Sequence, residues 1–147
     1  RRANQLVTLD AVGMFDAPIF EGEPAPGDQP RMPNPHGSAP LAERAKAYLH
    51  TNCSQCHRQG SALRSQFDVQ WETPAGERGL CGVEPVTGRL GIEGAKLVAP
   101  GAPGESLVHV RAGRRDANGM PPLASLQVDR RGVDLLAAWI KSLDGCP

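Results

Sequence analysis

Cys53-Ser54-Gln55-Cys56-His57 is the stretch that decides the fold, because it has the spacing C-x-x-C-H. This pattern is typical of covalent haem attachment. Two cysteines three residues apart lie on one side of a helical turn, where they can form thioethers with the two vinyl groups of one haem. The adjacent His57 is then directed at the iron as its proximal ligand. The motif predicts one haem c per chain.

Two other kinds of site also use a C-x-x-C pair. A dithiol redox site normally lies between a strand and a helix of a βαβ unit, and no such pattern flanks Cys53. A zinc site would need a second ligand pair at short spacing, and Cys81 and His50 offer only an irregular one. Both alternatives stay open, although haem attachment is favoured.

Helical periodicity leads into the motif and returns near the C-terminus. Residues 41–50 carry an apolar stripe of Leu41, Ala45, Tyr48 and Leu49, and Pro40 suits the first helical position. Residues 133–143 carry a second stripe, with Asp129 as a possible N-cap and Gly145 placed to stop the helix. A shorter helix is predicted over 105–112, ended by Gly113.

The composition indicates a mainly α fold with long loops. The chain has 17 glycines and 14 prolines in 147 residues, and strand alternation after residue 40 is weak. Aromatic residues make up only 4%, so a buried porphyrin would have to supply much of the core. We therefore expect the haem-free chain to be largely unfolded.

Residues 1–38 read as a proline-rich extended linker or strap, and residues 39–147 as the folded domain. Within the strap, residues 6–12 are apolar enough for one short strand, whereas the prolines of residues 21–40 exclude a helix. The chain begins at Arg1 without an apolar leader, so we expect a processed product or a piece of something longer.

Two broad classes of function are disfavoured by composition. Sixteen basic and sixteen acidic residues give a formal net charge of zero, which argues against a nucleic-acid binder. No run of about 18 apolar residues occurs, so no membrane span is predicted.

Met120 is the candidate for the second axial position of the iron. It lies in Asn118-Gly119-Met120-Pro121-Pro122, where the glycine and the two prolines would hold the loop extended and stiff, so that the thioether can be presented. A methionine beside two prolines is ordinarily a packing residue, but the haem motif upstream favours ligation.

Other sulfur and imidazole groups compete less well with Met120. Met14 and Met32 lie in the strap, before the attachment helix. His109 could replace Met120 and give a haem with two histidine ligands. His50 precedes His57 on the same predicted helical run, which makes it a rim residue.

The chain resembles a class I c-type cytochrome domain over about residues 39–147. The resemblance rests on the helix that ends in the C-x-x-C-H motif, the Met120-Pro121 loop and the final helix, in that order. It implies that the first and last helices cross, so that Tyr48 and Leu49 meet Leu136, Trp139 and Ile140. Many members carry a Gly-Pro after the motif whose carbonyl bonds the proximal histidine. Here it is missing, so the partner of His57 is unassigned.

Two stretches of the sequence, YLHTNCSQCHRQG and RRDANGMPPL, carry a narrower resemblance. These stretches look like the cytochrome modules appended to large secreted bacterial oxidoreductases or carbohydrate-active proteins. The resemblance implies a periplasmic or secreted bacterial protein. An attached or co-secreted oxidoreductase would be its redox partner, such as a dehydrogenase donor or a copper oxygenase acting on polysaccharide.

Cys81 and Cys146 are left over once the haem takes Cys53 and Cys56. The compartment that the family implies is oxidising, so a Cys81–Cys146 disulfide is expected, with free or intermolecular thiols as the alternative. It would close a loop of about 65 residues and stabilise the fold by about 2–4 kcal/mol.

Three arginines, Arg111, Arg114 and Arg115, cluster just before the Met120 loop. They could pair with the haem propionates, or form a solvated basic face that docks an acidic partner. Trp71 could contact the haem edge or simply pack within its loop.

These features predict electron transfer by a low-spin haem with both axial positions filled by His57 and Met120, and no enzymatic activity. If Met120 is not a ligand, the open iron would instead suit a haem enzyme or a gas sensor. A structural module without haem chemistry would leave the motif unused.

Overall fold

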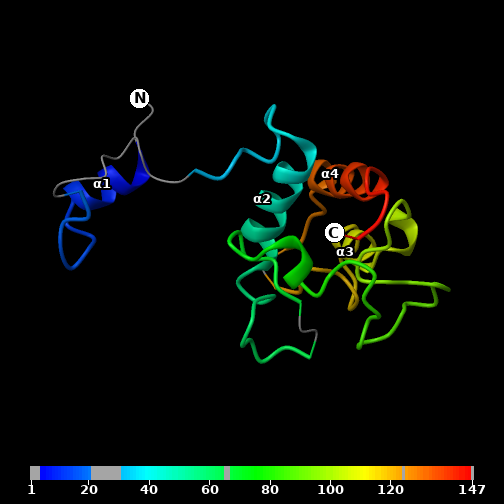
Figure 1. Cartoon of the computed structure of the whole chain (residues 1–147). Helices are drawn as coiled ribbons and strands as arrows, with labels where there is room; N and C mark the ends of the chain where they lie inside the picture. Colours follow the sequence, from blue (N-terminus) through cyan, green and yellow to red (C-terminus); the bar gives the residue numbers. More distant parts are fainter. Residues whose placement is uncertain (1–3, 21–30, 65–66, 124, 147) are drawn as a thin grey trace. The chain divides into compact units, whose positions relative to one another are not determined.

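The computed structural model describes residues 4–20, 31–64, 67–123 and 125–146 of the chain. It divides into two compact units, Arg1–Met32 and Pro33–Pro147. Among the described residues, the regular elements are helices and two isolated bridges, so the protein is mainly helical (Figure 1). None of these helices has the length and apolar character needed to cross a membrane.

The first unit contains helix α1, Gln5–Ala11, where the sequence predicted a short strand. That prediction was wrong. The Asn4 side chain accepts the Leu6 N–H at 2.9 Å, and the Thr8 hydroxyl donates to the Asn4 carbonyl at 3.1 Å. These local hydrogen bonds pair backbone groups at the start of a helix. A strand would instead need a neighbouring strand to pair its backbone groups. Residues 31–40 contain no helix, as expected, and residues 21–30 lie outside the described part.

Helix α2, Leu41–Cys53, opens the second unit and runs three residues further than predicted. Pro40 is its N-cap rather than its first residue, and the Pro40 carbonyl accepts the Arg44 N–H at 3.1 Å. The apolar stripe is buried as expected, at Ala45, Tyr48 and Leu49. The extra turn makes the first cysteine of the motif the last residue of the helix.

Helix α4, Arg130–Lys141, begins earlier and ends earlier than predicted. Asp129 is its N-cap, as expected, and accepts the Gly132 N–H at 3.1 Å. The helix ends at Lys141 with Ser142 as its C-cap, and Gly145 does not end it. The Ser142 hydroxyl donates to the Trp139 carbonyl at 2.7 Å, and the Ser142 N–H donates to carbonyls of the last turn.

Helix α3, Leu107–Ala112, is shorter than the predicted 105–112. Ser106 is fully buried and extended, and its hydroxyl accepts the Ala99 N–H at 2.9 Å. The residues before it form the 3-10 helix η2, Pro103–Glu105, and a second 3-10 helix, η1, spans Ala75–Glu77. Gly113 caps α3, as predicted.

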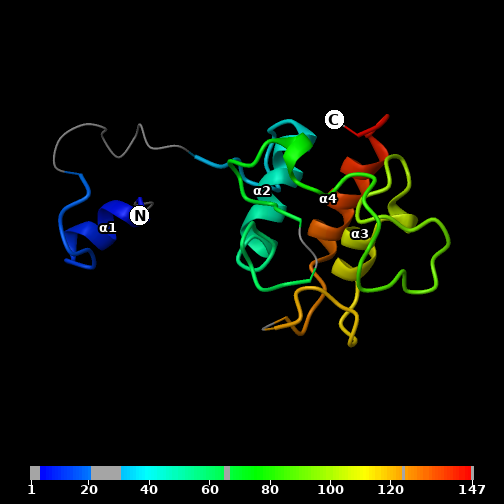
Figure 2. The same cartoon turned by 60° about the horizontal axis from the view of Figure 1, so that its bottom comes forward.

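The core forms where α2 packs on α4, which lie side by side in Figures 1 and 2. Tyr48 and Leu49 of α2 share one buried cluster with Leu136 and Ile140 of α4, and Trp139 packs against it. Gly132 lies at the crossing, where a Cβ atom would be only 2.2 Å from Cζ of Tyr48. The predicted contact between the two helices is therefore present. Its close approach requires glycine at position 132.

Cys81 and Cys146 form a disulfide that spans 65 residues of sequence, with their Cα atoms 5.5 Å apart. The bond ties the glycine-rich excursion that follows Leu80 to the chain end beyond α4. Cys81 also pairs with Val98 in an isolated parallel bridge, so the tether continues into the buried core.

Replacing Gly132 by alanine tests the helix crossing. We expect Gly132→Ala to lower the free energy of unfolding by about 1–3 kcal/mol, because the new methyl group overlaps the Tyr48 ring. This is the net loss after the higher helix propensity of alanine, which acts in the opposite direction by about 1 kcal/mol, has been subtracted. Chemical denaturation measures the difference, with Gly104→Ala as control because a Cβ there meets nothing within 4 Å. Unchanged stability in Gly132→Ala would contradict the close crossing.

Removing the disulfide tests the tether. The double variant Cys81→Ser/Cys146→Ser should lose about 2–4 kcal/mol of unfolding free energy, because its unfolded chain is no longer constrained by a closed loop. Circular dichroism should show the helix content retained. Equal midpoints of denaturation in the variant and the parent chain would show that the bond contributes nothing.

Candidate functional site

A cavity of about 300 Å³ lies among α2, α3, α4 and the loops between them. Its volume is at the lower end of small-molecule sites, which are about 300–1,000 Å³. Cys53, Cys56, His57 and Met120 all line it, so residues far apart in the sequence meet at one place. The rest of the wall is largely apolar and includes Leu49, Leu97, Leu107, Val108 and Leu136.

The motif is held on a continuation of the last turn of α2. The Cys53 carbonyl accepts the N–H groups of Cys56 and His57 at 3.2 and 2.8 Å. Both cysteines are free thiols, Cys53 half-buried and Cys56 exposed. Burial, together with the neighbouring Cys56, raises the pKa of the Cys53 thiol to about 11, so Cys53 is protonated at neutral pH.

The imidazole of His57 stacks on Phe67, with ring centroids 4.0 Å apart and planes 9° from parallel. Phe67 is buried and also lines the cavity. The His57 carbonyl accepts the Val69 N–H at 3.0 Å, which holds the returning chain beside the motif. Sequence reasoning missed Phe67. Its only signal is that it is one of three phenylalanines and lies in a polar stretch.

Met120 is half-buried and follows a glycine that the backbone requires. A Cβ on Gly119 would lie 2.5 Å from the Arg114 carbonyl oxygen, because the loop returns onto the backbone after α3. The Met120 N–H donates to the Arg111 carbonyl at 2.9 Å. The predicted reason for the glycine was an extended, stiff loop. The observed reason is this close approach.

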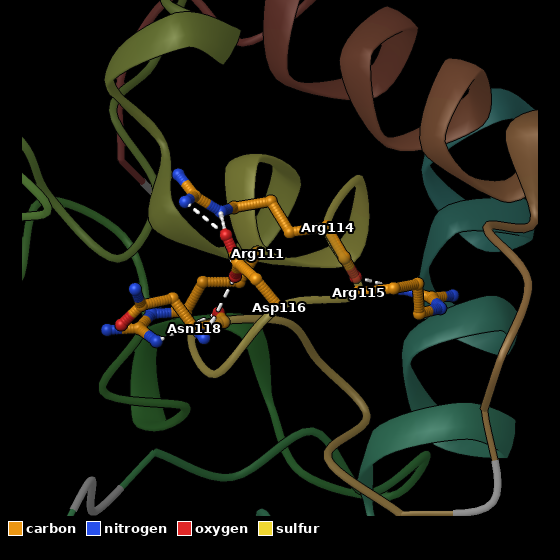
Figure 3. A network of polar contacts seen from close by, with 5 residues as sticks. All are labelled: Arg111, Arg114, Arg115, Asp116 and Asn118. Atoms are coloured by element: carbon orange, nitrogen blue, oxygen red, sulfur yellow. Dashed lines mark hydrogen bonds and ion pairs between the residues drawn. The ribbon is translucent and has the colours of Figure 1, made fainter.

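The three clustered arginines have different surroundings. Arg114 forms an ion pair with Asp116 at the surface, and its guanidinium lowers the pKa of that carboxyl. Arg111 and Arg115 line the cavity instead. Figure 3 shows the Arg114 side chain directed at Asp116, and the Arg115 side chain extending to the opposite side. Of the three, the structure therefore leaves Arg111 and Arg115 beside the cavity.

Two further residues of the cavity wall were assigned only packing or capping roles by the sequence. Tyr48 and Asp129 both line the cavity. Burial raises the pKa of Tyr48 above its ordinary value, and the Asp129 carboxylate raises it further. Tyr48 therefore keeps its proton, and its hydroxyl pairs with the Asp129 carboxylate. No sequence pattern separates this role from that of an ordinary core tyrosine.

Several competing residues lie outside the cavity wall. His109 Nδ1 is 3.0 Å from the Pro103 carbonyl oxygen, and His50 Nδ1 accepts the Trp71 N–H at 2.8 Å. Trp71 packs beneath Lys46, whose Nζ is 4.4 Å from the ring centroid. Trp71 is not among the residues that line the cavity, and its contact with Lys46 is of the loop-packing kind. Met14 and Met32 belong to the first unit.

The donor set around the cavity is what a covalently attached haem requires: two thiols, an imidazole and a thioether on an apolar wall, with cationic side chains at the edge. Within the described ranges, no group of three or more His, Cys, Asp or Glu is placed to hold a metal ion. A haem needs no such group, because the porphyrin supplies four ligands.

Comparison with known proteins gives no match: no family model, no curated protein and no solved structure is similar to this chain. The residues of the site therefore carry the functional argument alone.

Replacing the two cysteines of the motif tests whether folding of the domain depends on a haem bound in the cavity. We expect Cys53→Ala/Cys56→Ala, produced in a host that matures c-type haem, to lack covalent haem. It should also lose cooperative thermal unfolding and most helical ellipticity, because the apolar wall then has nothing to pack against. A haem-free chain with the parent's helix content and a sharp melt would contradict this dependence.

Proposed function

We propose that the second unit is an electron-transfer domain of the class I cytochrome c type, with one haem c bound covalently. One observation carries the proposal: Cys53, Cys56, His57 and Met120 line a single apolar cavity. The close crossing of α2 and α4 and the order of elements around them support the same fold.

Each residue then has a distinct role. Cys53 and Cys56 would hold the haem as thioethers, and His57 and Met120 would be its axial ligands. The bound haem supplies a one-electron iron couple. Phe67 fixes the plane of the His57 ring, because a stacked aromatic partner resists its rotation.

The surroundings of the cavity favour the reduced state of such a centre. A thioether ligand stabilises ferrous iron, and the apolar wall disfavours the extra positive charge of the ferric form. With His57 and Met120 both bound to it, the iron would change its surroundings little between oxidation states. The protein would therefore pass single electrons and leave substrate chemistry to its partner.

The partner and the compartment follow from the same proposal. Zero net charge favours docking by local patches rather than long-range steering. An attached or co-secreted oxidoreductase, such as a dehydrogenase or a polysaccharide-active copper oxygenase, would exchange electrons with this domain. The Cys81–Cys146 bond is of the kind that persists in a periplasmic or extracellular setting.

Met120→Ala tests the second axial ligand. We expect this variant to keep its covalent haem, to lose the red charge-transfer band of a methionine-ligated ferric haem, and to bind carbon monoxide when reduced. Its reduction potential should fall, because the ligand that stabilises ferrous iron is gone.

Met32→Ala is the control, because Met32 lies in the first unit and should behave like the parent chain. If the parent itself binds carbon monoxide, the open-site alternative of a haem enzyme or gas sensor replaces the proposal.

A further inference from the structure

The guanidinium of Arg115 lies where three segments of the chain meet. Its Nε donates to the Gln127 carbonyl at 2.9 Å. Its Nη1 donates to the carbonyls of Ala112 at 3.0 Å and Met120 at 3.2 Å, and also contacts the Arg114 carbonyl. One side chain thus joins the end of α3, the methionine and the segment that leads into α4.

The chain after Met120 borders the cavity and has little of the protein packed over it. Pro121, Pro122 and Leu123 line the cavity, Leu123 is 78% exposed and Leu126 is 95% exposed. Proline has no N–H group, so the two prolines cannot donate backbone hydrogen bonds. Hydrogen bonds to backbone carbonyls therefore provide much of the restraint that comes from the protein itself.

Two arginines restrain the Met120 loop from its two sides. Before the methionine, Arg111 Nη1 donates to the Asn118 carbonyl at 3.0 Å (Figure 3). The Arg111 carbonyl accepts the Met120 N–H. From Met120 onward, Arg115 donates to the carbonyls of Met120 and Gln127. Hydrogen bonds from a charged donor are stronger than neutral ones, which suits them to ordering an exposed loop.

We propose that Arg115 is a positioning residue for the axial methionine. By bonding the Met120 carbonyl while it is anchored to Ala112 and Gln127, it keeps the thioether at the cavity. The inference rests on the proposed function, because it concerns Met120 as a ligand. It assigns Arg115 a task different from the propionate contact or basic docking face considered from the sequence.

The shape of the guanidinium group is essential to this task. Its planar fork carries donors in several fixed directions, so Nε and Nη1 of one group can reach the carbonyls of Gln127, Ala112 and Met120 at once. A lysine ammonium keeps the charge but cannot reproduce that geometry. Glutamine keeps a donor but loses the charge and the fork. The two substitutions therefore separate charge from geometry.

The test uses the full haem-loaded chain and the displacement of Met120 from ferric iron by imidazole. In Arg115→Gln, we expect methionine dissociation, read from the loss of the red charge-transfer band, to be faster by about tenfold or more. Arg115→Lys should lie between this variant and the parent. The covalent haem, the helix content and the His57 side of the site should be unchanged in both.

Arg114→Gln is the matched control. Arg114 is the sequence neighbour, carries the same charge and pairs with Asp116 at the surface rather than with the loop carbonyls. Its dissociation rate should stay within about twofold of the parent value. If Arg115→Gln proves too unstable to isolate, Arg115→Lys carries the comparison.

Equal dissociation rates in the Arg115 and Arg114 variants would overturn the positioning role and leave the electron-transfer proposal intact. If the parent chain shows no charge-transfer band at all, Met120 is not the ligand, and both the inference and the proposed ligation fail. The two failures are therefore distinguishable in one series of spectra.

Discussion

The contact between Tyr48 and Gly132 is the constraint on which the rest of the structure depends. A Cβ on Gly132 would be 2.2 Å from the tyrosine ring, so the axes of α2 and α4 can approach this closely only at a glycine. That approach places the C-terminal turn of α2, with Cys53, beside the N-terminal turn of α4, with Asp129, and both border the cavity. The same helix crossing thus positions both the hydrophobic cluster and the candidate site.

The two sides of the candidate site are held by different means. On one side, Cys53, Cys56 and His57 are close in sequence and share one hydrogen-bonded turn, which fixes their relative positions. Phe67 stacks on the His57 imidazole and restrains it further. The methionine side has little burial and relies on hydrogen bonds from arginine side chains to carbonyls. This division would give a fixed proximal ligand and a distal ligand whose hold on the iron is set by polar contacts.

Helices with strong apolar periodicity could be predicted from the sequence, as could the Asp129 and Gly113 caps, but several other helix ends could not. Those ends depend on particular side chains: the Ser142 hydroxyl stops α4 before Gly145, and buried Ser106 delays the start of α3. Helix α1 was missed because one asparagine cap outweighs a β-like composition. Within the site, the motif stands out by its spacing, and Met120 stands out by its glycine and proline neighbours once the motif is recognised. Arg115 could be picked out as one of three clustered arginines, but its contacts with the carbonyls of Met120 and Gln127 form only on folding. No local pattern marks Phe67.

The most direct measurement is an optical spectrum of the chain made in a haem-maturing host, recorded oxidised, then reduced, with and without carbon monoxide. We expect haem that stays with the denatured polypeptide, a red charge-transfer band in the oxidised form, and sharp reduced bands that carbon monoxide leaves unchanged. High-spin bands that shift with carbon monoxide, or a chain that carries no covalent haem, would contradict it.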